Sequence, residues 1–176
     1  MNYVRLGQSG LEVSPLCLGT MMFGDRTDAV DSARIIAAAR DAGINFIDTA
    51  DAYSKGGAER IVGPAVREHR RDWILATKVA NVMTQSPRDG GLSRRWIMLG
   101  CDDSLRRLGL DEIDLYYLHK DDSRTPLAET VAAMGDLIRA GKIRYFGLSN
   151  FRGWRIASLV AECDAQRVPR PVVCQP

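Results

Sequence analysis

The sequence lacks the features that mark membrane-spanning, secreted and nucleic-acid-binding proteins. No stretch approaches the roughly 18 continuous apolar residues of a membrane span, and Met1–Glu12 has no apolar core of the kind that a signal peptide needs. The 24 basic and 22 acidic residues nearly balance and form no run of five like charges. Neither nucleic acid nor a membrane is therefore expected as a partner, and we predict a cytoplasmic location.

Cysteine is also scarce. The 4 cysteines lie far apart, and no CxxC motif or Cys/His cluster of the kind that binds zinc is present, so no metal site is expected. We interpret the cysteines as small buried apolar residues in a reducing compartment, at Cys17, Cys101, Cys163 and Cys174.

What the sequence does contain is an alternation of short apolar runs with longer amphipathic segments, which is typical of repeated βα units. The sequence has 176 residues, and 45% of them are hydrophobic. We therefore expect residues 1–176 to form one domain with a substantial core. A hairpin is expected first, with strands at Val4–Leu6 and Leu11–Val13. Six buried parallel strands should follow, at Leu16–Gly19, Asn45–Thr49, Ile74–Lys78, Ile113–His119, Arg144–Asn150 and Val172–Gln175.

Between these runs the apolar period becomes helical, and three stripes end at a glycine suited to a left-handed cap. These stripes are Val30–Ala37 before Gly43, Ile97–Leu108 before Gly109, and Leu127–Ile138 before Gly141, with a further helix at Ile156–Cys163. Ser93 is the expected N-cap of the helix that ends at Gly109.

Pro64 interrupts the weakest predicted helix, Ala58–Arg67. Proline has no amide hydrogen to donate to the carbonyl oxygen of Arg60, and its ring crowds that turn. We therefore expect a kink or break near Gly63, or a helix that starts only around Pro64.

Two architectures fit repeated βα units, a doubly wound open sheet and a closed (β/α)8 barrel. A dinucleotide-binding open sheet should show GxGxxG after its first strand, whereas this chain has Gly19-Thr20-Met21-Met22-Phe23-Gly24 there. The pattern therefore favours the barrel.

Polar residues stand at the carboxyl ends of five successive predicted strands. In a barrel these ends share one rim, so the side chains would converge over its mouth. Taken singly, each has an ordinary explanation as a turn former, a solvated lysine, a packed tyrosine or a structural histidine. The hypothesis of a site rests on the whole set, which is Asp48 with Tyr53 five residues on, Lys78, His119, Ser149-Asn150 and Gln175.

Part of this set can protonate a carbonyl oxygen. A tyrosine is a poor proton donor at neutral pH because its pKa lies near 10, but a nearby ammonium group favours the phenolate. Lys78 would supply this charge beside Tyr53, and Asp48 would keep Lys78 protonated. His119 would hydrogen-bond the same carbonyl oxygen. None of these side chains can deliver hydride, so a cofactor must supply it.

Several motifs resemble the aldo-keto reductase family. The motifs are Asp48-Thr49-Ala50-Asp51-Ala52-Tyr53, similar to DTAxxY; Ala76-Thr77-Lys78; the run from Arg107 to His119; and Gly141 to Phe151, similar to GKIRxxGxSNF. The resemblance implies a (β/α)8 TIM barrel that reduces a small aldehyde or ketone with NADPH. It also implies a catalytic tetrad of Asp48, Tyr53, Lys78 and His119, in which Tyr53 is the proton donor. It further implies that Ser149, Asn150 and Gln175 hold the nicotinamide carboxamide, and that Gly19, Thr20 and Asp48 lie near the nicotinamide ribose.

The sequence departs from the family pattern in three places. Ser54 replaces the glycine that commonly follows the tyrosine, with little expected effect, and Pro64 falls inside the second helix. The sequence ends at Pro176, before the last two strands of such a barrel and the parts that hold the adenosine phosphate. We expect a barrel truncated after the sixth strand, whose open edges favour aggregation, oligomerisation or a complementing fragment.

The leading functional hypothesis is an NADP-dependent reductase of small carbonyl compounds. Two alternatives stay open. One is a regulatory subunit that binds NADPH and modulates an ion channel, as some relatives of this fold do. The other is an inactive, truncated reductase fragment.

Overall fold

The computed structural model describes residues 1–86 and 88–176, and the chain begins with a hairpin. Strand β1 (Val4–Arg5) pairs antiparallel with β2 (Glu12–Val13). The hydroxyl of Ser9 donates to the carbonyl oxygen of Leu6 at 2.7 Å and closes the turn. The predicted hairpin is confirmed.

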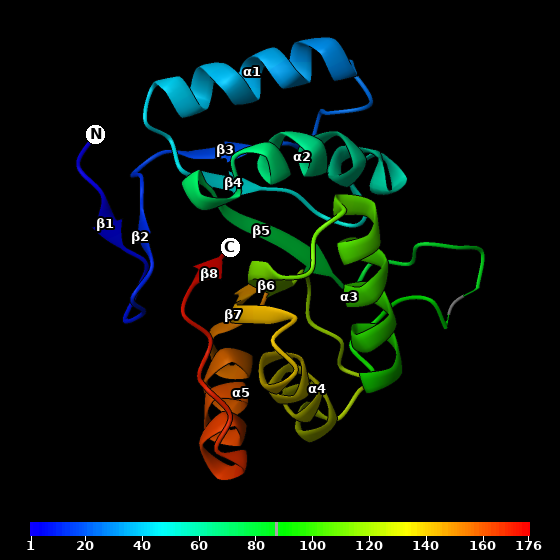
Figure 1. The fold of residues 1–176 in the computed structure, drawn as a ribbon. Helices are drawn as coiled ribbons and strands as arrows, with labels where there is room; N and C mark the ends of the chain where they lie inside the picture. Colours follow the sequence, from blue (N-terminus) through cyan, green and yellow to red (C-terminus); the bar gives the residue numbers. More distant parts are fainter. Residues whose placement is uncertain (87) are drawn as a thin grey trace.

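Six parallel strands follow in the part of the chain that the structure describes, and they pair in chain order to form a curled sheet (Figure 1). A doubly wound sheet reverses its strand order at a switch point, and the described strands show none, so their order is that of a barrel. The structure therefore shows a half-barrel with the predicted hairpin before it. The strands are β3 (Cys17–Gly19), β4 (Phe46–Asp48), β5 (Ile74–Val79), β6 (Ile113–Leu118), β7 (Ile143–Ser149) and β8 (Cys174–Gln175).

Within the described residues, α-helices connect the strands and cover the outer side of the sheet (Figure 1). None of them is long and apolar enough to cross a membrane. They are α1 (Ala29–Asp41), α2 (Gly57–Glu68), α3 (Arg94–Leu108), α4 (Leu127–Arg139) and α5 (Gly153–Gln166), with single turns η1 (Tyr53–Gly56) and η2 (Arg70–Asp72).

The predicted caps of α3 are confirmed. The hydroxyl oxygen of Ser93 accepts the backbone N–H of Trp96 at 3.3 Å, which satisfies one of the free donors of the first turn. Gly109 ends the helix with a φ of 66°, in the left-handed region that a side chain rarely adopts.

The expected break near Gly63 and the alternative start around Pro64 were wrong, because α2 runs without interruption from Gly57 to Glu68, whereas the kink stays a prediction. Packing against α3 offsets the lost hydrogen bond. A Cβ atom at Gly63 would lie 2.2 Å from the carbonyl oxygen of Leu108, so the two helices approach very closely there. Val62 is also fully buried, and this contact holds the helix together across the proline.

The pleat of the strands divides the core into two layers. On the outer face, residues such as Ile47 and Tyr116 pack against the helices in the main core. On the inner face, Phe46 and Leu115 form a smaller cluster with Val13 of the hairpin. The hairpin thus covers the amino end of the inner space, and the polar strand ends lie at the opposite end.

The prediction that all four cysteines are buried is wrong for the two on the edge strands. Cys101 and Cys163 are buried as expected, but Cys17 and Cys174 are exposed. These two residues lie on β3 and β8, which each pair with a single neighbour among the described strands. Their side chains therefore lack the cover that the central strands have.

Candidate active site

Three neighbouring strands bring Asp48, Lys78 and His119 to one face of the sheet. Asp48 ends β4 and pairs with Ala76 of β5, and Lys78 lies two residues beyond Ala76. Lys78 pairs in turn with Tyr117 of β6, and His119 lies two residues beyond Tyr117. Because side chains alternate along a strand, residues two apart share a face, which places all three at the inner mouth.

Lys78 lies at the centre of the site and is fully buried. Its ammonium group donates to the Thr49 carbonyl oxygen at 2.9 Å, to the Tyr53 hydroxyl oxygen at 3.1 Å, and to the Asp48 carboxylate. An ammonium group has three hydrogens, so these acceptors satisfy it and make its burial tolerable. The expectation that Lys78 lies beside Tyr53 and Asp48 is confirmed.

Asp48 is buried beside this ammonium group. Burial raises the pKa of Asp48, while the charge and hydrogen bond of Lys78, and less strongly the amide of Gln175, oppose the increase. The Oδ1 atom of Asp48 accepts from Lys78, and the buried Oδ2 atom has no well-placed donor among the described residues. That oxygen is therefore an acceptor available to a bound hydroxyl group.

Tyr53 reaches the site from a sharp turn after β4. Ser54 and Lys55 have φ values of 49° and 51°, in the left-handed region that favours glycine. The Ser54 hydroxyl donates to the Phe23 carbonyl oxygen at 2.7 Å and helps to hold the turn. This geometry explains why the family pattern has glycine at position 54, where serine bears a strain of about 1 kcal/mol.

His119 lies edge-to-face with Tyr53, with ring centroids 5.9 Å apart and an interplanar angle of 81°. Burial lowers the pKa of His119 to about 4, and the positive charges of Lys78 and Lys120 act in the same direction. The imidazole is therefore neutral at pH 7. Its Nδ1 atom lies 2.9 Å from Nδ2 of Asn81, a contact that sequence reasoning missed. The only signal was a polar residue three positions after Lys78.

Three of the predicted cofactor residues lie together beside His119. Ser149 pairs with Gln175 across β7 and β8, and the Gln175 carbonyl oxygen accepts the backbone N–H of Asn150 at 3.1 Å. The Asn150 amide nitrogen donates to the Ser149 hydroxyl oxygen and to the His119 carbonyl oxygen, both at 2.9 Å. This group therefore adjoins the candidate catalytic histidine.

The other two predicted cofactor residues lie beside Asp48. Gly19 pairs with Asp48 across β3 and β4. The backbone N–H and the hydroxyl of Thr20 both donate to the Asp48 carbonyl oxygen at 3.0 Å, so Thr20 supports that strand end. A methyl group at Gly19 would meet no other atom within 4 Å, which leaves room for a ligand against the backbone.

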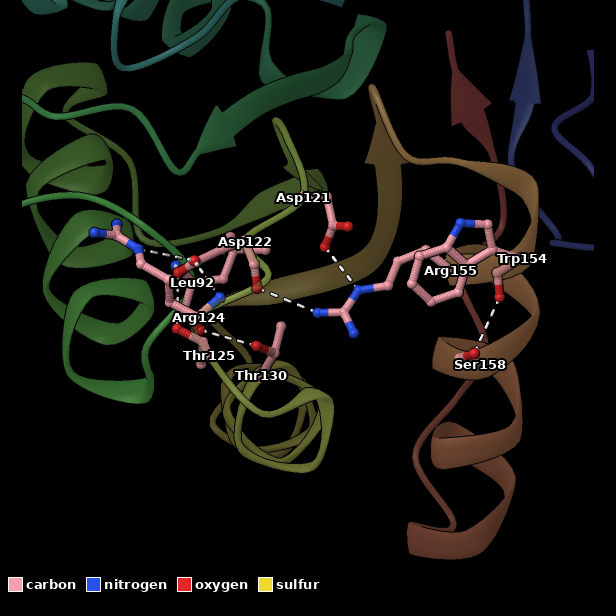
Figure 2. Close-up of polar contacts among 9 residues, drawn as sticks. All are labelled: Leu92, Asp121, Asp122, Arg124, Thr125, Thr130, Trp154, Arg155 and Ser158. Carbon is pink, nitrogen blue, oxygen red and sulfur yellow. Dashed lines mark hydrogen bonds and ion pairs between the residues drawn. The ribbon is translucent and has the colours of Figure 1, made fainter.

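Polar contacts also fix the loop that follows His119 (Figure 2). Asp121 accepts from the guanidinium of Arg155 on α5 at 2.9 Å, and the same guanidinium donates to the Asp122 carbonyl oxygen at 3.2 Å. The Asp122 carboxylate accepts the backbone N–H of Leu92 at 3.0 Å. The loop is thus tied to α5 and to the end of the preceding loop, which restrains the histidine.

A phenol, a buried ammonium group, a carboxylate and a neutral imidazole thus meet at the carboxyl ends of parallel strands in a half-barrel. Groups of these kinds can exchange protons with a bound molecule, and they lie where barrel enzymes have their active sites. Residues 15–176 match the model of the family described as "Aldo/keto reductase family". The chain belongs to this family of oxidoreductases.

Among the curated relatives, some are named as potassium channel subunits and others as oxidoreductases. The chain is 39% identical over 180 residues to a "Probable voltage-gated potassium channel subunit beta" of Arabidopsis thaliana, an alignment that covers 100% of the chain and 55% of that protein. It is 41% identical over 179 residues to an uncharacterized oxidoreductase of Bacillus subtilis, with 95% and 55% covered. It is 33% identical over 176 residues to "L-glyceraldehyde 3-phosphate reductase" of Escherichia coli K12, with 96% and 51% covered. The chain therefore spans about half the length of these relatives.

Proposed function

We propose that the protein reduces a small aldehyde or ketone to an alcohol by hydride transfer from NADPH, with Tyr53 as the proton donor. The observation that carries this proposal is the 3.1 Å contact between the buried ammonium group of Lys78 and the hydroxyl of Tyr53. A positive charge at this distance stabilises the phenolate that remains when the proton has left.

Each side chain has a distinct role in the proposed step. The proton moves from the Tyr53 hydroxyl to the carbonyl oxygen of the substrate while two electrons arrive at the carbonyl carbon as hydride. Lys78 stabilises the resulting phenolate, and Asp48 balances the charge of Lys78 in its buried position. Neutral His119 donates a hydrogen bond to the carbonyl oxygen, which orients the substrate and polarises the bond that is reduced.

A reduced nicotinamide cofactor supplies the hydride when it is bound, and family membership favours NADPH. The residues present fit this group. The buried Oδ2 atom of Asp48 is an acceptor suited to a ribose hydroxyl, and Thr20 and the open backbone at Gly19 adjoin it. Ser149, Asn150 and Gln175 offer the amide and hydroxyl groups that would hold the carboxamide.

The test is the oxidation of NADPH with a panel of short aldehydes and ketones, followed by its absorbance. We expect turnover with at least one carbonyl compound and a large loss in Tyr53→Phe. Tyr3→Phe is the matched control, because Tyr3 is exposed and its hydroxyl donates to the Gly43 carbonyl oxygen at 3.0 Å, at the amino-terminal hairpin. Equal losses in both variants would contradict the proposal.

The name of the Arabidopsis relative favours a second candidate, a regulatory subunit of a potassium channel. Such a protein would bind NADPH without needing rapid turnover. Co-purification with a channel, together with NADPH binding and no reduction of any tested carbonyl compound, would support this role. A protein that binds no NADPH would instead support the third hypothesis, an inactive reductase fragment.

A further inference from the structure

Asn81 makes a contact that determines which nitrogen of His119 can carry a proton. Its Nδ2 atom lies 2.9 Å from the Nδ1 atom of His119, and both side chains are half-buried. The nitrogen of an asparagine side chain can only donate hydrogen bonds. A neutral imidazole has one donor and one acceptor, so an Nδ1 atom that accepts from Asn81 requires the proton of His119 to be on Nε2.

The backbone next to Asn81 is held in an unusual conformation. Ala80 has a φ of 147°, a region that residues with a side chain rarely adopt, and it is fully buried. Its carbonyl oxygen accepts the backbone N–H of Gly91 at 2.8 Å, while the Val79 carbonyl oxygen accepts the backbone N–H of His119 at 2.8 Å. Hydrogen bonds from two segments thus fix the residues before Asn81. Strain of this kind persists only where the surrounding structure enforces it, and it is often found at functional sites.

The groups around His119 leave few other ways to set its tautomer. Two charged groups act on the imidazole of His119, Lys78 on β5 and Lys120, which follows His119 in the chain. Both disfavour the imidazolium form. The Tyr53 ring lies edge-to-face with the imidazole at 5.9 Å between centroids. Asn81 is the neighbour whose hydrogen bond discriminates between Nδ1 and Nε2 in the described residues.

We propose that Asn81 is a positioning residue that holds His119 in the neutral tautomer with its hydrogen on Nε2. The Nε2–H group can then donate to the carbonyl oxygen of an aldehyde or ketone. The part that concerns the substrate rests on the proposed reductase function, whereas the tautomer follows from the Asn81 contact alone.

The tautomer can be measured directly by long-range ¹H–¹⁵N NMR of protein labelled at histidine. The chain has only 2 histidines, and the other, His69, lies at the end of α2, so the spectrum has few signals. A His69→Gln variant assigns them. Between pH 6 and pH 8 we expect the pattern of a neutral imidazole protonated at Nε2 for His119. A pattern of predominant Nδ1 protonation would overturn the proposal.

Two variants test whether Asn81 is the cause. Asn81→Asp replaces a donor with a carboxylate acceptor, so we expect the His119 proton to move to Nδ1 and the pKa of His119 to rise from about 4 towards or above its usual range. Asn81→Leu removes the donor without adding charge, so we expect a mixture of tautomers, and this variant serves if the aspartate variant does not fold. An unchanged Nε2 tautomer in Asn81→Leu would overturn the proposal.

Kinetic measurements separate this proposal from the reductase function. If the protein is a reductase, Asn81→Asp should lower kcat by about tenfold or more, up to the roughly 10²- to 10⁴-fold loss of an acid–base group, with a smaller change in KM. Asn81→Gln, which retains the amide donor, should recover part of kcat. A protein that shows the expected tautomers but reduces no carbonyl compound would contradict only the reductase function. An active enzyme in which His119 has the same tautomer in the wild type and in the Asn81 variants would contradict only the positioning role.

Discussion

Asp51 should make the protein less stable as the pH rises towards neutrality. Its carboxyl group is buried, and neither oxygen has a well-placed donor among the described residues. Burial raises the pKa of Asp51 to about 7, and the negative charge of nearby Glu59 adds to the effect. Glu59, in contrast, is paired with the Arg107 guanidinium at 2.5 Å and with the Thr77 hydroxyl at 2.6 Å.

The magnitude follows from the difference between the folded and unfolded states. An aspartate in an unfolded chain has a pKa of about 3.9. Between about pH 3.9 and about pH 7, Asp51 binds one proton more in the folded protein than in the unfolded chain. The free energy of unfolding therefore falls as the pH rises. The decrease is about 1.4 kcal/mol per pH unit, which amounts to about 4 kcal/mol by pH 8.

Replacement of Asp51 by asparagine, which has a similar shape and no charge, should remove this dependence. We expect Asp51→Asn to gain stability relative to the wild type by up to about 4 kcal/mol between pH 4 and pH 8, as measured by urea unfolding at each pH. Asp111→Asn is the control, because Asp111 is exposed. A difference between Asp51→Asn and the wild type that does not change with pH would refute the reasoning.

Three further substitutions test the packing, the turn and the site. Gly63→Ala should lower the free energy of unfolding by about 1–3 kcal/mol, because the methyl group would overlap the Leu108 carbonyl oxygen, whereas Gly153→Ala, which meets open space, should leave it unchanged or slightly higher. Equal unfolding midpoints for the two variants would contradict this contact. Lys55→Gly should raise stability by up to about 1 kcal/mol, because φ is 51° there, and a clear loss in urea unfolding would argue against the turn. Lys78→Met should reduce carbonyl reduction at least about 100-fold in a steady-state assay, and a rate within a factor of about two would exclude its role.

The meeting of Asp48, Lys78 and His119 could be predicted from the sequence because parallel strands have a common direction. Once each residue is assigned to the carboxyl end of a strand, the alternation of side chains places all three at one mouth. The single-domain organisation and the cytoplasmic location stay predictions. The catalytic roles also stay proposals until activity is measured.

Other features depend on tertiary contacts that no local pattern contains. Pro64 predicts a broken helix by local rules, but the close approach of Gly63 to α3 keeps the helix continuous. The contact between Asn81 and His119 follows directly after the unusual backbone of Ala80, which an alanine does not predict. The burial of Asp51 was not expected either, because aspartate in a segment after a strand is usually exposed.

The rate of the chemical step in Tyr53→Phe tests the central claim most directly. A single-turnover experiment with NADPH-saturated protein and an aldehyde substrate separates this step from cofactor release. We predict a loss of about 10²- to 10⁴-fold, because the variant removes the proton donor, while the NADPH dissociation constant from fluorescence titration stays nearly the same. A variant that retained more than about half of the wild-type rate would contradict the assignment of Tyr53 as the acid.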